Sequence, residues 1–320
     1  MNKISKFQDE VSQLISLENG SKIGVALSGG SDSLALCILL HQWLKEVNGV
    51  LIAITIDHQL RPESSKEALT VKSLLKNYGI THHIIPWLGP KPSSNLQEEA
   101  RLARYKLLTD YCHQNNITYL FTGHQQNDQA ENFIIRADHG TGVYGLAGIP
   151  SVTEFNKIKI IRPLLNFNKE ELQNFLNEQN IEWIEDPSNQ NERFARVKAR
   201  NFLKQHPKWI VKLAALSKNL TRAKDAIEYL LNQSMDEIVT FKDKSASIEL
   251  EKFNQLPQEI RFRMIAQILQ TISAKEKPAR AERIENLLAK IKMGSEFKTS
   301  TLSECLIKHK KNQLIITPEY

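Results

Sequence analysis

The alternation of short apolar segments with helical patterns constrains the fold of this chain more than any other feature. Buried strands are short, apolar and rich in β-branched residues, and four segments fit that description: 22–28, 49–57, 81–87 and 118–124. A helical pattern follows each of them, over 33–44, 64–79, 95–116 and 127–137. Strands that alternate with helices in this way form a parallel sheet with helices on both faces. We therefore predict an α/β fold with a parallel, Rossmann-like sheet.

The pattern changes in the last third of the chain. A further strand over 158–165 and a capped helix over 168–180 continue the first part, but after Trp209 the apolar spacing is mainly helical. A chain of 320 residues is long enough for two domains. We expect a larger domain over 1–215 and a smaller, mainly helical domain over 216–320.

The composition argues against a membrane protein. No window approaches the roughly 18 uninterrupted apolar residues that a membrane-spanning helix needs. The N-terminal segment carries acidic residues and lacks the long apolar stretch of a signal peptide. The cysteines lie far apart, which indicates a reduced compartment and offers neither a CxxC pair nor a zinc-ligand spacing; they are Cys37, Cys112 and Cys305. We expect a cytoplasmic protein without a membrane partner.

Basic residues are concentrated in one part of the chain. The net charge is +6, and ten lysines and arginines lie between Arg193 and Lys224, where there is no Asp or Glu. A solvated helix face gives such a run, and so does a surface that binds a polyanion, of which nucleic acid is the commonest. Composition alone leaves both interpretations open.

A glycine-rich turn links the first predicted strand to the first predicted helix. It reads SGGSDS over residues 28–33, and Gly29 and Gly30 let backbone N–H groups approach an anion closely. The helix that follows directs its positive end at the same place. The turn lacks the lysine of a Walker A motif and does not match GxGxxG, so it is either a structural turn or another kind of phosphate loop. Hydroxyl donors for a phosphate would come from Ser28, Ser31 and Ser33.

Polar residues follow the later strands, at the sheet edge where ligands of such folds bind. Asp128 and Glu131 are three residues apart, so on a helix their carboxylates share one face. A solvent-facing pair, an incomplete metal site and a site for an ammonium group all fit this spacing. His124 ends a strand beside this face, either as a structural donor or as a hydrogen-bond partner of a reacting centre.

Four more residues fit either a phosphate site or an ordinary structural role. The guanidinium groups of Arg104 and Arg136 match phosphate geometry, but they also fit ion pairs on a helix face. Asp57 and His58 close the second strand, where they either contact a ligand or form a simple strand-end turn.

Several motifs jointly resemble one family. SGGSDS resembles the SGGxDS signature of the PP-loop ATP pyrophosphatases. Further stretches resemble motifs of the tRNA(Ile)-lysidine synthetases, namely DHQLRPES (57–64), NLQEEARLARYKLL (95–108), GHQQNDQAENFIIR (123–136) and the block from RPLL (162–165) through EDPSN (185–189) to residue 200. The matches are collinear, so the chain is identified as a member of this family.

The resemblance implies that the protein is a ligase. Members of the family modify the wobble cytidine of an isoleucine tRNA with a CAU anticodon. ATP adenylates the cytosine carbonyl oxygen with release of pyrophosphate, and free L-lysine then displaces AMP to form lysidine. The resemblance thus implies ATP and Mg²⁺ as cofactors, and this tRNA and lysine as partners. Both a monomer and a homodimer fit the sequence, because no residue pattern gives an oligomeric state.

The resemblance also implies roles for individual residues. ATP is expected on Ser28, Gly29, Gly30, Ser31, Asp32, Ser33, Asp57 and His58, with Asp32 also placing Mg²⁺. Lysine is expected on Asp128 and Glu131. The expected catalytic set is Asp32, Arg104, His124, Asp128, Glu131 and Arg136. The expected tRNA contacts are Arg193, Arg196, Lys198, Arg200 and Lys204, together with the small C-terminal domain.

Two departures from the family pattern affect the expected metal and phosphate contacts. Asn127 stands where an aspartate is common, and His139 where an arginine is common. The alternative function is that of a PP-loop tRNA thiolase, which needs a reactive cysteine or a CxxC cluster, and the isolated cysteines argue against it. A small-metabolite synthetase would need a glutaminase domain, for which the chain has no room. A non-catalytic tRNA-binding module would not need the loop over 28–33 or the carboxylate pair.

Overall fold

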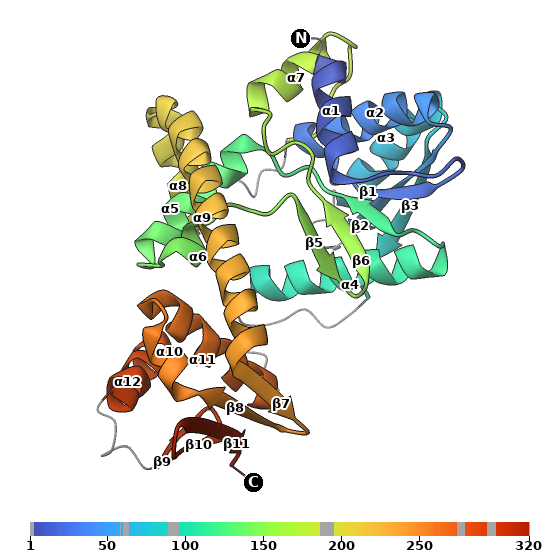
Figure 1. Cartoon of the computed structure of the whole chain (residues 1–320). Coiled ribbons are helices and arrows are strands. Elements are labelled where there is room, and N and C mark those ends of the chain that lie inside the picture. Colours follow the sequence, from blue (N-terminus) through green and yellow to red (C-terminus); the bar gives the residue numbers. More distant parts are fainter. Residues whose placement is uncertain are drawn as a thin grey trace. The chain divides into compact units, whose positions relative to one another are not determined.

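A computed structural model describes residues 3–57, 59, 64–88, 96–185, 195–273, 279–292 and 299–319. The chain divides into two compact units, Met1–Leu220 and Thr221–Tyr320, both drawn in Figure 1. The first unit is the larger one. The tRNA-binding role that the sequence analysis gives to the C-terminal part stays a prediction.

The first unit is built on a six-stranded sheet with the strand order β3-β2-β1-β4-β6-β5. The strands are β1 (Lys22–Ala26), β2 (Val50–Asp57), β3 (Thr81–Pro86), β4 (Tyr119–Phe121), β5 (Val152–Phe155) and β6 (Ile158–Ile161). Five of them pair in parallel, which confirms the predicted parallel, Rossmann-like sheet. Strand β5 was not predicted and runs antiparallel to β6. Asn156 and Lys157 turn this hairpin with positive φ angles, and only the asparagine is typical of such a turn.

Helices cover both faces of this sheet. On one face lie α1 (Lys3–Leu14), α2 (Ser31–Glu46), α3 (Ser64–Asn77) and α7 (Lys169–Asn177), and on the other lies α4 (Leu96–Gln114). The remaining helices pack against one another in a separate cluster, namely α5 (Gln126–Asp138), α6 (Val143–Leu146) and α8 (Ala195–Gln205). Strand β2 shows how one apolar strand serves two cores. Leu51 and Ala53 pack in the cluster that contains α1, α2 and α7, whereas Ile52 and Ile54 pack with α4, because side chains alternate along a strand. Figure 1 shows α1 and α2 on one side of the sheet and α4 on the other.

The second unit has its own sheet and core. Helix α9 (Lys208–Ile238) begins in the first unit and ends in this one. The other elements are β7 (Val239–Lys242), β8 (Ser245–Glu249), α10 (Leu250–Gln255), α11 (Gln258–Ser273), α12 (Ala281–Lys292), β9 (Thr299–Leu302), β10 (Cys305–Lys310) and β11 (Gln313–Pro318). The strands form an antiparallel sheet in the order β7-β8-β11-β10-β9. The helices were predicted and the sheet was not, because its strands are four to six residues long and interrupted by charged residues, as in CLIKHK.

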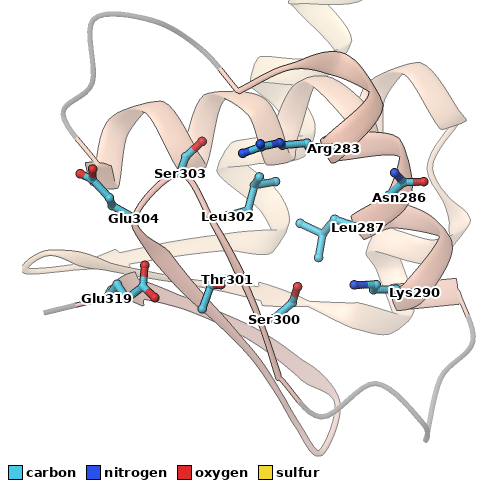
Figure 2. A pocket seen from close by; sticks show the side chains of 10 residues that line it. All are labelled: Arg283, Asn286, Leu287, Lys290, Ser300, Thr301, Leu302, Ser303, Glu304 and Glu319. Carbon is cyan, nitrogen blue, oxygen red and sulfur yellow. The ribbon is translucent and has the colours of Figure 1, made fainter.

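A pocket of about 350 Å³ in the second unit is lined by side chains of α12 and β9 (Figure 2). Arg283 and Lys290 of α12 line it together with Ser300 and Thr301 of β9. None of the site residues predicted from the sequence lies there, so the candidate site must be sought in the first unit. Across the described ranges, no helix combines the length and the apolar character that crossing a membrane requires.

Candidate active site

The predicted phosphate loop lies between β1 and α2. Gly29 has a φ angle of +82°, and a Cβ at this position would lie 3.0 Å from Cδ1 of Ile184. The Ser33 hydroxyl shapes the loop, because it donates to the carbonyl of Gly30 at 3.1 Å and accepts from the N–H of Ser28 at 3.1 Å. Helix α2 follows Gly30, which has no side chain to cap the free N–H groups of the helix. An anion can take that place.

The end of β4 touches this loop. A Cβ on Gly123 would lie 2.9 Å from the backbone nitrogen of Ser33, a distance that real Cβ atoms do not adopt. Glycine at this position therefore allows β4 and the start of α2 to meet. The contact brings His124 and helix α5 to the phosphate loop. The sequence analysis gave Gly123 no role.

Asp32, at the start of α2, lies close to a second carboxylate. Burial first and the negative charge of Asp128 second raise the pKa of Asp32 to about 6, against an opposing effect of Lys169. The Ser31 hydroxyl donates to Oδ1 of Asp32 at 3.2 Å. Two carboxylates in one site resist ionising together, and a cation between them removes that penalty. The phosphate loop and α5 thus form one electrostatic site.

A capping box fixes the start of α5, which carries the predicted lysine-binding carboxylates. Oδ2 of Asp128 accepts from the N–H of Gln125 at 2.9 Å, and Oε1 of Gln125 accepts from the N–H of Asn127 at 2.6 Å. Glu131 follows one turn later, with only 5% of its side chain exposed. The solvent-facing interpretation of this pair is therefore wrong. Both carboxylates are held toward the interior of the site.

Two arginines of α8 supply the positive charge that the pair needs. Nε of Arg196 donates to Oε2 of Glu131 at 2.9 Å, and its Nη2 pairs with Oδ1 of Asp128. Nε of Arg200 donates to Oε1 of Glu131 at 2.9 Å. The sequence analysis assigned these arginines to tRNA and the carboxylates to lysine. In the structure the two sets meet, which no local pattern reveals across some 65 residues of sequence.

His124 lies among positive charges and is neutral at pH 7. Its pKa falls to about 3, through burial first and then through four arginines: Arg162, Arg196, Arg104 and Arg101. Nδ1 of His124 lies 2.9 Å from the hydroxyl oxygen of Thr122. Arg104, on α4, is half-buried, and the desolvation of its guanidinium lowers its pKa. The predicted residues His124 and Arg104 are thus brought together with Arg196.

Arg162 belongs to this cluster, although the sequence analysis gave it no role. It follows β6, is 5% exposed, and donates from Nη1 to the carbonyl of Pro150 at 2.9 Å and to Oγ1 of Thr153 at 3.0 Å. Its Nε has no hydrogen-bond partner among the described residues. A buried guanidinium with neutral partners favours an anionic ligand nearby. The sequence offered one indication of a role for Arg162, because it is the first residue of the RPLL motif that resembles the family.

Asp57 is occupied by the start of α3. Its Oδ1 accepts from the Ser64 hydroxyl at 2.8 Å, and its Oδ2 accepts from the Ser65 hydroxyl at 2.6 Å. These contacts match the strand-end turn that the sequence analysis kept as the structural alternative. Because Asp57 ends β2 beside the phosphate loop, it also shapes one border of the candidate ATP site.

The other predicted residues lie away from this cluster or outside the described residues. Arg136 is exposed in the last turn of α5, and Lys198 and Lys204 are exposed on α8. Two residues lie outside the described ranges, namely His58 and Arg193.

Known proteins resemble this chain in sequence. A sequence profile of the PP-loop domain matches residues 3–207. Curated relatives named tRNA(Ile)-lysidine synthase come from Orientia tsutsugamushi (33% identical, covering 100% of this chain and 75% of the relative), Rickettsia bellii (34%, 98% and 74%) and Wolbachia pipientis (35%, 92% and 70%).

A solved structure shares the fold at lower similarity. The U34-tRNA thiolase NcsA from Methanococcus maripaludis, with its 4Fe–4S cluster, is 22% identical and superposes with a TM-score of 0.57, covering 68% of this chain and 80% of that one. Relatives about one third identical over nearly the whole sequence decide the family. The phosphate loop and the buried carboxylate pair fit that result, and the chain belongs to the tRNA(Ile)-lysidine synthase family of PP-loop proteins.

Proposed function

We propose that this protein ligates lysine to C2 of the wobble cytidine of a tRNA(Ile) with a CAU anticodon, at the expense of ATP. ATP adenylates the C2 carbonyl oxygen and pyrophosphate leaves; a lysine amine then attacks C2 and AMP leaves. The observation that carries the proposal is the carboxylate pair beside the phosphate loop, formed by the half-buried Asp128 and the buried Glu131. The names of the relatives support the same reaction.

Lysine fits the carboxylate pair by its charge. The pair already binds the guanidinium groups of Arg196 and Arg200, and an ammonium group offers N–H donors to the same oxygen atoms. Lysine has two amino groups, so one is held as an ammonium ion while the other, deprotonated, attacks. The displaced arginines then face the phosphates of AMP or of the RNA.

The phosphate loop suits ATP with Mg²⁺. Backbone N–H groups after Gly29 and Gly30 would hold phosphate oxygens, and Asp32 would offer carboxylate oxygens to Mg²⁺. No group of three or more His, Cys, Asp or Glu side chains within the described ranges could hold a metal ion. A single carboxylate agrees with a magnesium ion that arrives with the nucleotide, because Mg²⁺ at such sites takes its other ligands from phosphates and water.

The arginines around His124 suit the leaving AMP. Arg104, Arg162 and Arg196 place positive charge where negative charge gathers on the α-phosphate. His124 is neutral in this field and acts as a hydrogen-bonding group rather than as a cation. Bound phosphates would offset the arginines and raise the pKa of His124.

The cysteines do not support thiolation. Three buried thiols are described, those of Cys37, Cys112 and Cys305. Burial raises the pKa of Cys37 to about 12, and it does the same for Cys112. The thiolate is the reactive form of cysteine, so these side chains are unsuited to carry sulfur.

The test is incubation of the purified protein with labelled lysine, Mg·ATP and a transcript of tRNA(Ile) carrying the CAU anticodon. We expect label in the tRNA and release of AMP and pyrophosphate, with a transcript whose wobble base is uridine as the control. An unlabelled transcript would refute the proposal, more so if sulfur were incorporated under thiolation conditions. Because tRNA, ATP and free lysine are its proposed substrates, we also propose a cytoplasmic location. Light scattering of the same sample tests whether the protein is a homodimer.

A further inference from the structure

The corner between α8 and α9 exposes a group of aromatic rings. Phe202 is 41% exposed and Trp209 is 47% exposed, with ring centroids 6.4 Å apart and planes at 61°. The ring of His206 lies 4.8 Å from that of Phe202. Large rings in water forgo the free energy of burial, so rings that gather at one exposed place mark an interaction surface.

This corner is fixed relative to the candidate active site. The N–H of Trp209 donates to the carbonyl of His206 at 2.9 Å and closes the turn between the helices. On the inner side, Leu203 and Leu213 are buried against Phe133 of α5. Helix α5 also carries the carboxylate pair, so the corner with the exposed rings packs on the same helix that forms the site.

Positive charge surrounds the rings. Nζ of Lys212 lies 5.9 Å from the ring centroid of Trp209, and Lys204 and Lys208 are exposed beside it. The sequence from Arg193 to Lys224 contains no Asp or Glu. A basic surface of this kind attracts polyanions. Exposed aromatic rings within it match the way proteins bind unpaired nucleotides, where bases stack on rings and cations contact the phosphates.

We infer that Phe202 and Trp209 form a stacking platform for unpaired bases of the RNA substrate, with lysines of α8 and α9 on the adjoining phosphates. The inference rests on the proposed function, because it takes the RNA to be the tRNA that is modified. Phe202 lies about 3 Å along the helix axis from Arg200 and about 9 Å from Arg196. Because residues 200 and 202 are about 200° apart around the helix, the platform binds nucleotides outside the pocket of the reacting base rather than within it.

The test compares the affinity of ring variants for the tRNA transcript by fluorescence anisotropy at several salt concentrations. Phe202→Leu and Trp209→Leu keep apolar bulk but remove stacking, and each should raise Kd about tenfold. Trp209→Phe should restore most of the affinity. The slope of log Kd against log salt should stay unchanged in these variants, whereas Lys208→Ala should reduce it by about one. Val50→Ala, at an exposed apolar side chain that begins β2, is the control and should bind as the wild type does.

Two results would overturn the inference. One is an unchanged Kd for the tRNA in the double Leu variant; the other is an equal loss of affinity for an RNA duplex, which offers no unpaired base. Failure of the proposed function looks different, since the wild type would then bind RNA through these rings without incorporating lysine. If the wild type incorporates lysine and the ring variants bind tRNA as tightly as it does, the proposed function stands and only the stacking platform is refuted. Thermal melting and ATP binding of each variant show that the fold is preserved.

Discussion

Burial and a neighbouring carboxylate make Asp32 costly to ionise in the ligand-free protein, with a pKa of about 6 against 3.8 in the unfolded chain. The folded state therefore binds this proton more tightly, and the associated stability is present below about pH 4 and lost as the pH rises through 6. Asp32→Asn cannot ionise, so it should melt like the wild type near pH 4 and at a higher temperature above pH 7. Above pH 7 the free energy of unfolding of the variant should exceed that of the wild type by on the order of 3 kcal/mol.

Thermal denaturation of both proteins between pH 4 and pH 8 checks this prediction. Asp138→Asn, at the exposed end of α5, is the control. A difference in melting temperature that stays constant with pH would mean that ionisation of Asp32 is not the cause. Mg·ATP should reduce the difference in melting temperature between the wild type and Asp32→Asn, because a bound cation stabilises the ionised carboxylate.

Asp128 is expected to serve lysine more than ATP. Asp128→Asn keeps an oxygen that can accept the capping hydrogen bond from Gln125 but loses the negative charge. The KM for lysine should rise about tenfold or more, while adenylation of the tRNA, measured as pyrophosphate release without lysine, should stay within a few fold. If both steps fell equally, Asp128 would be acting on ATP or on Mg²⁺ instead.

At the level of elements, the contact between the end of β4 and the start of α2 leaves no room for a side chain at Gly123. Gly123→Ala should shift the phosphate loop, lower stability by about 1–3 kcal/mol and weaken ATP binding. Gly142→Ala is the matched control, because a Cβ there meets no atom within 4 Å and its φ angle is −78°. Equal ATP affinity and equal melting temperature in the two variants would show that the loop tolerates the extra atom.

The pairing of α5 with α8 predicts competition for the carboxylates. Arg200→Gln removes one guanidinium from Glu131 and should cost about 2 kcal/mol of stability. Free lysine should then bind the tRNA-free protein several-fold more tightly, which isothermal calorimetry measures. Lys204→Gln, an exposed charge on the same helix, should change neither quantity. A loss of lysine binding in Arg200→Gln would mean that Arg200 contacts lysine itself.

On the scale of the whole molecule, the second unit has what an independent domain needs. Its core includes Phe253, Met264, Ile307 and Ile316, and all five strands of its sheet come from the second unit itself. A fragment over 221–320 should therefore unfold cooperatively on heating, as circular dichroism would show. A melt without a transition would contradict this. Adding the fragment as a competitor of tRNA binding tests its predicted RNA-binding role.

Sequence patterns predicted the parts of this molecule that depend on local order. A few consecutive residues encode each of these parts, namely the buried strands, the phosphate loop and the helix that carries Asp128 and Glu131. The pairing of Arg196 with Glu131, the role of Arg162 and the close approach at Gly123 depend on tertiary contacts, which no periodicity encodes. The sheet of the second unit was missed because short strands with alternating charges resemble loops.

The capping box of α5 ties the proposed lysine site to the stability of the helix. Asp128 closes the first turn of the helix with one oxygen and offers the other to a cation. A glutamate closes the capping box of α7 at the equivalent position, so it would keep both the cap and the charge, whereas an alanine would lose both. A non-acidic residue at position 128 would therefore remove the cap of α5 together with the charge of the proposed lysine site. An engineer seeking a different amine donor at that proposed site would need to supply a new cap for α5 with any such change.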